Sequence, residues 1–404
     1  MICAFCMIMP DMLSMNLLNL YDTLTRPYYT SEKKFQFYSF TYGGIFTRQF
    51  GSHGSVSNPL RIWEPEQLAL EMLQGYNPCT AIAKKSAQID ASDNGRRGHI
   101  CFDGTFRILF SFGAAWRFFV HNNWSIGVYI PSYVMRLSHV KTHDLTESIT
   151  DEDLRTKEFL TNPWVLPQET CALGDLDIGG WQRGGLGDIV TQAEWYQDFI
   201  QQRPILRNVR LNWRIGVGIP TARRVDENKL IAISFGRDGA WSIPLGIGLD
   251  FTVGSWFRTG VDVQLTFIFG NKRHRRIKTY PTQTDLLLLT KLDAYKDFGL
   301  EQQYNLYVEF FSRNLSFKCG YQYITQGDDE LSFGNNNFSP NIANLLVKLH
   351  DRTMHEIILV GWYDMKDLIK SSTEVKIGMF SQLPFNGRRS FAQQTLSLMV
   401  AVNF

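Results

Sequence analysis

The stretch TLSLMVAVNF, residues 395–404 at the end of the chain, decides the fold. Side chains alternate between the two faces of a β-strand. One face of this stretch therefore carries five apolar side chains: Leu396, Leu398, Val400, Val402 and Phe404. The other face is mostly polar or small. This pattern fits the edge strand of a soluble β-sandwich, and it also fits the closing strand of a membrane β-barrel, which is apolar toward lipid and polar toward the lumen.

The same alternation recurs upstream in unusually long segments. From Trp241 to Val253, seven apolar side chains alternate with smaller or polar residues, and similar patterns cover residues 106–118, 209–219 and 261–269. Strands of soluble proteins are usually about 5–6 residues long, whereas a transmembrane strand needs about 9–11. Strand length, more than alternation itself, therefore favours a membrane barrel.

Twelve such segments lie along the chain, near residues 33–48, 98–120, 124–140, 185–200, 205–221, 239–253, 256–270, 301–312, 315–326, 354–366, 373–384 and 391–404. Short turns alternate with long connections at 49–97, 141–184, 222–238, 271–300 and 327–353. Outer-membrane barrels have an even number of strands, short periplasmic turns and long outer loops. The sequence therefore predicts an all-β protein, an antiparallel transmembrane up-and-down barrel of about 12 strands (range 10–14), with Phe404 at the periplasmic end.

Composition limits the other classes of protein. The 404 residues carry a formal net charge of only +2, so the protein has no overall positive electrostatic field that would attract nucleic acid. No stretch approaches the ~18–20 apolar residues of a transmembrane helix. Met1 to Leu20 is fairly apolar but has no Lys or Arg, which makes it a poor signal peptide. We therefore divide the chain into residues 1–32, a poor or truncated leader, and residues 33–404, a single barrel domain.

The polar faces of the strands give a set of candidate lumen residues. Those predicted to line the lumen and set selectivity are Arg107, Arg117, Arg210, Arg214, Asp250, Arg258, Asp262, Glu309 and Lys318. Both signs are present, so charges on neighbouring strands can neutralise one another. Such a ladder can simply hold the barrel together, or it can form the narrow part of a channel.

Aromatic side chains give a second set. The topology places five tryptophans and the terminal residue at periplasmic strand ends, where aromatic rings suit the membrane interface. This predicted membrane-interface girdle consists of Trp116, Trp124, Trp195, Trp256, Trp362 and Phe404.

The long connections carry further motifs. Residues 65–76, 285–295 and 340–350 have helical spacing and could plug the lumen or lie on its rim. The basic run from Lys272 to Lys278 could bind lipid phosphates or simply be solvated. Cys79 and Cys171 fall in predicted loops and could pair in an oxidising compartment.

The sequence contains only weak matches to metal-binding and catalytic motifs. Asp90 to Gly95 resembles the start of a calcium-binding EF-hand loop, but position 12 is Cys101 where the loop needs Glu. The histidines are scattered, and none belongs to a nucleophile motif. We therefore expect no catalytic residue, no metal and no cofactor, and the protein is not expected to be an enzyme.

Two short motifs and the chain terminus resemble known families. The amphipathic last strand ending in Phe404 is similar to the C-terminal signature of bacterial outer-membrane barrels, which the barrel-assembly machinery recognises. Gly185-Leu186-Gly187-Asp188 and the later Gly216-Val217-Gly218-Ile219-Pro220-Thr221 resemble a pattern in FadL-like and phenol-degradation-type outer-membrane transporters. The resemblance covers about a tenth of the chain. It implies passage of hydrophobic small molecules, but those fatty-acid transporters have fourteen strands and a plug-forming start that this sequence does not reveal.

These observations predict a barrel in the outer membrane of a Gram-negative bacterium, acting as a porin-like channel or transporter. Small solutes, including hydrophobic ones, would pass through a polar lumen. The alternative is a plugged barrel with a structural or surface-interaction role. Expected partners are membrane lipid, lipopolysaccharide, the barrel-assembly machinery and the solute, with no nucleic acid.

Overall fold

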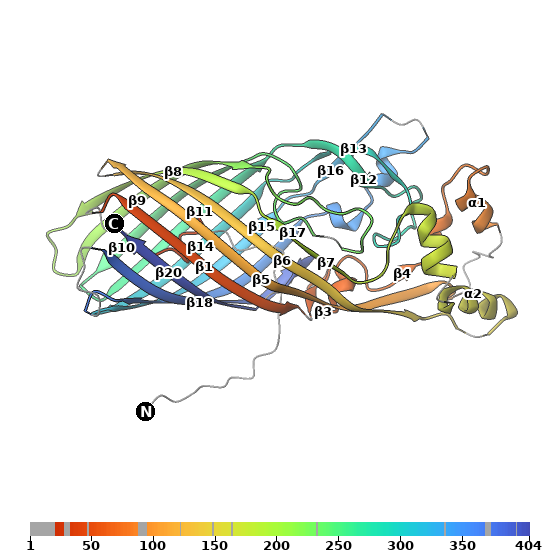
Figure 1. Ribbon diagram of the computed structural model, residues 1–404, viewed down its shortest axis with the longest axis horizontal. Coiled ribbons are helices and arrows are strands. Elements are labelled where there is room, and N and C mark those ends of the chain that lie inside the picture. The colour runs from red at the N-terminus through yellow and green to blue at the C-terminus, as the bar shows by residue number, and fades with distance from the viewer. Residues whose placement is uncertain are drawn as a thin grey trace, which may run out of the picture.

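The computed structural model describes residues 21–27, 33–46, 48–87, 95–121, 123–147, 149–162, 165–231, 233–334, 337–367, 373–392 and 394–404. Twelve antiparallel strands close into a barrel, as Figure 1 shows. In chain order they are β1 (Phe35–Phe46), β5 (His99–His121), β6 (Trp124–Asp144), β8 (Ile189–Ile200), β9 (Leu206–Ile219), β10 (Ser242–Val253), β11 (Phe257–Ile268), β14 (Glu301–Ser312), β15 (Leu315–Gln326), β17 (Arg352–Asp364), β18 (Glu374–Arg388) and β20 (Thr395–Asn403). The predicted twelve-stranded barrel is confirmed.

The last strand closes the barrel. β20 pairs with β18 on one side and with β1 on the other, with Gln36 opposite Asn403 and Phe37 opposite Val402. Leu396, Leu398 and Val400 are exposed on its outer face, and Ser397 and Met399 between them are buried. In Figure 1 the C-terminus lies at the end of the barrel that has short turns, and the long connections gather at the other end.

The outside of the barrel is apolar, as alternation requires. Exposed large apolar side chains from most of the strands form an outer belt that includes Phe110, Phe112, Phe118, Ile126, Trp213, Ile215, Val217, Ile247, Val261, Phe267, Leu306, Phe310, Phe317, Ile377, Met379, Leu396, Leu398 and Val400. Within the described residues, no helix has the length and apolar character needed to cross a membrane. A closed barrel with an apolar outer belt and short turns at one end is the architecture of bacterial outer-membrane barrels.

The long connections form a cap over one end of the barrel (Figure 1). Its strands are β2 (Gln49–Phe50), β3 (Val56–Ser57), β4 (Gln67–Leu68), β7 (Trp181–Leu186), β12 (Asn271–Arg276), β13 (Lys291–Asp297), β16 (Glu330–Ser332) and β19 (Ser390–Phe391). Its helices are η1 (Pro59–Arg61), η2 (Glu71–Leu73), α1 (Ala81–Ser86), α2 (Asp151–Thr161), η3 (Val165–Thr170), η4 (Cys171–Gly174), α3 (Pro340–Ala343) and η5 (Val347–Leu349).

The predicted loop helices are largely wrong. Residues 65–76 contain a short strand and a single 3-10 turn, and residues 285–295 run from a buried coil into β13. Only α3 and η5 correspond to the third prediction, 340–350. The leucines that suggested helices are buried in the cap because the segments pack against each other, not because they form an amphipathic helix.

A β-bulge corrects the prediction for Arg107. The pairing of β5 with β6 shifts between Ile108 and Phe110, so the alternation of faces changes phase there. Phe106 and Ile108 are consequently buried inside the barrel, whereas Phe110 and Phe112 are exposed outside. Arg107 lies between two inward side chains and thus belongs to the outer face, not to the lumen.

Candidate functional site

A piece of the chain itself lies inside the barrel. Residues 21–27 are buried except for the half-buried Thr23, and Asp22 is their main anchor. The Asp22 carboxylate accepts hydrogen bonds from Gln303 Nε2 and Gln322 Nε2, both at 2.7 Å, and from the backbone N–H of Leu24 at 2.8 Å. Leu24 is fully buried and packs against the small surface of Gly320. A carboxylate and a leucine thus fix this segment to β14 and β15.

Both ends of this lumen segment are also held. Arg26 donates to Glu194 Oε2 at 3.1 Å and to the Tyr129 hydroxyl at 3.2 Å. At the other end, the Tyr21 ring packs edge-on against Tyr129, with ring centroids 5.8 Å apart. Lys318 donates to the backbone carbonyl of Thr23 at 3.3 Å. The lumen segment therefore touches several strands and obstructs the barrel.

The lumen segment separates two cavities. The outer cavity, of about 320 Å³, lies between Tyr21 and the cap, and its lining includes aromatic and aliphatic side chains such as Tyr133, Phe235, Ile268 and Leu286. The inner cavity, of about 70 Å³, lies toward the short-turn end and is lined by Thr23, Arg26, Pro27 and charged residues of the strands. A solute that crossed the barrel would meet both cavities and the segment between them.

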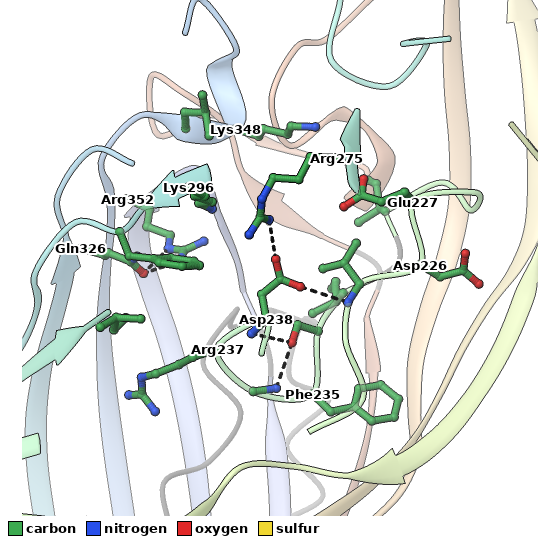
Figure 2. A pocket seen from close by; sticks show the side chains of 18 of the residues that line it. Asp226, Glu227, Phe235, Arg237, Asp238, Arg275, Lys296, Gln326, Lys348 and Arg352 are labelled. Carbon is green, nitrogen blue, oxygen red and sulfur yellow. Dashed lines mark hydrogen bonds and ion pairs between the residues drawn. The ribbon is translucent and has the colours of Figure 1, made fainter. Parts of the chain in front are cut away.

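Charged side chains surround the outer cavity on its polar side (Figure 2). Asp238 is their centre: it accepts from Arg275 at 2.6 Å, from the N–H of Val225 at 3.2 Å, and also from Arg273. Arg237 donates to Glu301 at 2.8 Å, and its Nε is buried without a hydrogen-bond partner. The polar wall is thus held in place by ion pairs and still has a spare N–H donor.

One wall of the outer cavity is a loop instead of a strand. β7 pairs with β6 but not with β9, so its other edge is not covered by the barrel sheet. Residues 222–231 and 233–240 cover that edge: the N–H of Arg223 donates to the carbonyl of Leu186 at 3.2 Å, and its guanidinium donates to that of Gly184 at 2.9 Å. The same loop supplies Phe235 and Asp238 to the cavity.

The predicted lumen residues, apart from Arg107, lie inside the barrel and are paired. Arg214 Nη2 lies 2.7 Å from Asp262 Oδ2, and Arg258 Nη1 lies 3.3 Å from Glu309 Oε2. The remaining contacts join Arg117 to Glu194, Arg210 to Asp198, Tyr307 to Asp250 and Lys318 to Thr23. The pairing forms a ladder of opposite charges across strands of the barrel, which stabilises the barrel.

The predicted girdle residues are not all outside. Trp124 is exposed and pairs across the sheet with Trp195, which pairs in turn with Trp213. Trp256 stacks on Phe310 with ring centroids 6.1 Å apart, and the other two outer contacts are Trp116 with Phe37 and Phe404 with Phe35.

Trp362 corrects the prediction for the girdle. It is 5% exposed and packs inside the barrel with its ring centroid 6.0 Å from that of Tyr38. It shares the inward face of β17 with Ile358 and Val360, because these residues are two positions apart. Together with Phe380 from the neighbouring strand β18 and Phe40 from β1, they make this side of the lumen apolar. The prediction of a uniformly polar lumen misses this apolar side.

The remaining motifs have other outcomes. Strand alternation in β12 turns Arg273 and Arg275 toward Asp238, and Arg276 is buried against backbone carbonyls, whereas Lys272 and His274 are exposed. The three arginines of the basic run are therefore part of the cap interior and are not solvated. Cys79 and Cys171 are both free. Residues 90–94 of the calcium-like motif lie outside the described residues. Among the residues that are described, no group of three or more His, Cys, Asp or Glu could hold a metal ion.

No periodic signal in the sequence marks the lumen segment. Residues 21–27 fall within the predicted leader, residues 1–32, and a single irregular pass through a lumen has no strand alternation. One indication was available: Asp22 and Arg26 offer charges of both signs to a lumen that contains both.

Comparisons with known proteins complete the description. No family model matches the sequence, and no curated protein matches it. Among solved structures, the chain is similar to an outer-membrane channel from Pseudomonas putida F1, with 9% identity, a TM-score of 0.49, and coverage of 96% of this chain and 100% of that one. It is also similar to the Ralstonia pickettii toluene transporter TbuX (8% identity, TM-score 0.34, 92% and 90% covered) and to a Pseudomonas aeruginosa FadL homologue (8%, 0.29, 92% and 89%). FadL-like barrels, to which the sequence motifs show resemblance, are thus among them.

Proposed function

We propose that the protein is a gated channel of the bacterial outer membrane, in which the lumen segment (residues 21–27) is the gate. The observation that carries this proposal is the placement of two cavities on either side of that segment. A barrel that served only as a scaffold has no need of a cavity of about 320 Å³ above its plug. Small-molecule sites of this kind combine an apolar wall with a few fixed polar groups.

The outer cavity suits a small solute with an apolar body and a polar group. Tyr133 and Phe235 offer aromatic surface, and Arg237 offers an N–H without a partner. Inside the barrel, the apolar side around Phe40 and Phe380 faces the paired charges of the opposite strands. A solute with an apolar body and a polar group can contact both surfaces along the path, whereas a strongly hydrated ion makes no favourable contact with the apolar side.

The gate is held mainly by hydrogen bonds to a single carboxylate. Each hydrogen bond to a charged group contributes about 1.5–3 kcal/mol, so the carboxylate of Asp22 is the main anchor of the lumen segment. We expect Asp22→Ala to free the segment while leaving every barrel strand unchanged. The matched control is Asp177→Ala, which removes an exposed carboxylate bound to Lys229 in the cap.

The test is single-channel recording in planar bilayers with the native protein and both variants. The proposal expects rare openings for the native protein, a higher open probability for Asp22→Ala, and native behaviour for Asp177→Ala. No conductance from any of the three proteins, with each shown to be folded by its heat-dependent gel migration, would refute the channel.

One observation favours a second candidate, a plugged barrel with a structural or surface-interaction role. The charges of the inner lumen neutralise one another, and Arg26 joins that network through Glu194. In this case the lumen segment is a permanent part of the core. The same recordings separate the two candidates, since a permanent plug predicts silence even for Asp22→Ala.

A further inference from the structure

Two arginines face each other on the outside of the barrel. Arg107 on β5 is the cross-strand partner of Arg136 on β6. The bulge after Ile108 places Arg107 on the outer face, and Arg136 is exposed there. Like charges directly opposite one another destabilise a sheet. Among the described residues, neither arginine forms an ion pair or hydrogen bond, and Arg107 Nε is buried without a partner.

Other basic groups extend this pair toward the cap. On the same outer face, Asp103 is opposite Lys141, and Lys141 is exposed. Both oxygens of Asp103 already have basic partners: Oδ1 accepts from Arg61 at 2.7 Å, and Oδ2 lies 3.2 Å from His143. The patch therefore keeps an excess of positive charge that no described acidic side chain neutralises.

The position of the pair relates it to the membrane. On β5, Leu109, Phe110 and Phe112 are 43%, 49% and 37% exposed and belong to the outer belt. Arg107 follows directly on the cap side of these residues, and Arg136 lies beside it. With the cap outside the cell, the two guanidinium groups stand at the headgroup level of the outer leaflet. Arginines at such a boundary bind phosphate bidentately.

We propose that Arg107 and Arg136 form a binding site for a phosphate group of an outer-leaflet glycolipid, with Lys141 in support. The phosphate sits between the two guanidinium groups and removes their repulsion, and the acyl chains of the same lipid lie along Phe110 and Phe112. This occupant explains the place of the pair, because a soluble anion would gain nothing from the adjacent apolar belt. The inference rests on the outer-membrane placement of the cap but not on channel activity.

The test uses native mass spectrometry of the purified protein in detergent, titrated with lipid A that carries two phosphates. We expect retention of lipid A by the native protein and at least about 10-fold weaker retention by Arg107→Gln/Arg136→Gln, since two charged hydrogen-bonding groups are lost. Arg207→Gln, which removes an exposed arginine at the opposite end of the barrel, should bind like the native protein.

Three further measurements make the result decisive. Lipid A without its phosphates should bind the native protein at least about 10-fold more weakly, and millimolar inorganic phosphate should not displace lipid A. Arg107→Lys/Arg136→Lys should fall between the native protein and the glutamine variant, because lysine keeps the charge but not the bidentate geometry. Equal retention of phosphorylated and phosphate-free lipid would overturn the site even if the glutamine variant failed to fold. Displacement by free phosphate would overturn the assignment to a lipid.

Discussion

The stability contribution of the Arg214–Asp262 ion pair tests whether water is excluded from the lumen around it. Arg214 is completely buried, and Asp262 has 4% of its side chain exposed. The guanidinium donates to Asp262 Oδ1 at 2.9 Å and to Asn212 Oδ1 at 2.8 Å. Replacing Arg214 with leucine leaves the Asp262 charge without its main partner. For a buried pair, that truncation costs about 3–5 kcal/mol, whereas a pair in contact with water contributes about 0–1 kcal/mol.

We therefore expect Arg214→Leu to lower the free energy of unfolding by about 3–5 kcal/mol if the lumen segment excludes water. The assay is urea unfolding in detergent micelles, followed by tryptophan fluorescence and by heat-dependent gel migration. Asp262→Leu alone should destabilise similarly, and the double variant should recover most of the loss, because no unpaired charge then remains. A loss below about 1 kcal/mol for Arg214→Leu would refute a dry lumen and indicate a water-filled path past this pair.

Three other substitutions test the packing and the cap. Gly246→Val should destabilise by at least about 1–3 kcal/mol in the same unfolding assay, because a Cβ there would lie 2.4 Å from Arg214 Nη2. Trp362→Ala should cost about 3–5 kcal/mol if the ring is inside the barrel, and much less if it faced lipid. Burial and the neighbouring Asp285 raise the pKa of Glu64 to about 7. The folded cap thus binds a proton that the unfolded chain releases near its ordinary pKa of 4.5, so cap stability should fall by at most about 3 kcal/mol as pH rises from about 4.5 to 7. The protection factors of residues 59–76 against hydrogen exchange, after correction for base-catalysed intrinsic exchange, should be lower at pH 8 than at pH 5, and Glu64→Gln should abolish that difference in protection.

The sequence predicts the barrel well because each strand obeys one strong constraint. One face meets lipid and the other meets the lumen, so the period of two appears in nearly every segment. The constraint acts between adjacent residues, and the prediction from it fails where the strand departs from regular alternation. The bulge between Ile108 and Phe110 changes the phase of alternation, and its one mark in the sequence is the run of three apolar residues Ile108-Leu109-Phe110. The period of two therefore places Arg107 on the wrong face.

The candidate site is less predictable because it depends on contacts distant in the chain. The anchor of the lumen segment joins Asp22 to Gln303 and Gln322, about 280 and 300 residues away in sequence. Trp362 satisfies the rule for an interfacial aromatic residue equally well whether it points out or in. Only the burial of its neighbours Ile358 and Val360 decides the question, and the lumen was not expected to have an apolar side.

The contacts of the cap indicate which barrier yields first. Residues 276–288 join several loops: Arg276 donates to the carbonyls of Gly174 at 2.8 Å and Leu288 at 2.6 Å, and Gln283 donates to that of Gln74 at 3.1 Å. The backbone N–H of Asp285 donates to the Glu64 carboxylate, and the Asp285 carboxylate accepts from the backbone N–H of Lys348. Opening the cap would break these contacts together, whereas release of the lumen segment needs mainly the loss of one carboxylate's hydrogen bonds and one arginine's. The lumen segment is therefore the weaker barrier, which is why its substitution is expected to change conductance when substitution of a single cap residue does not.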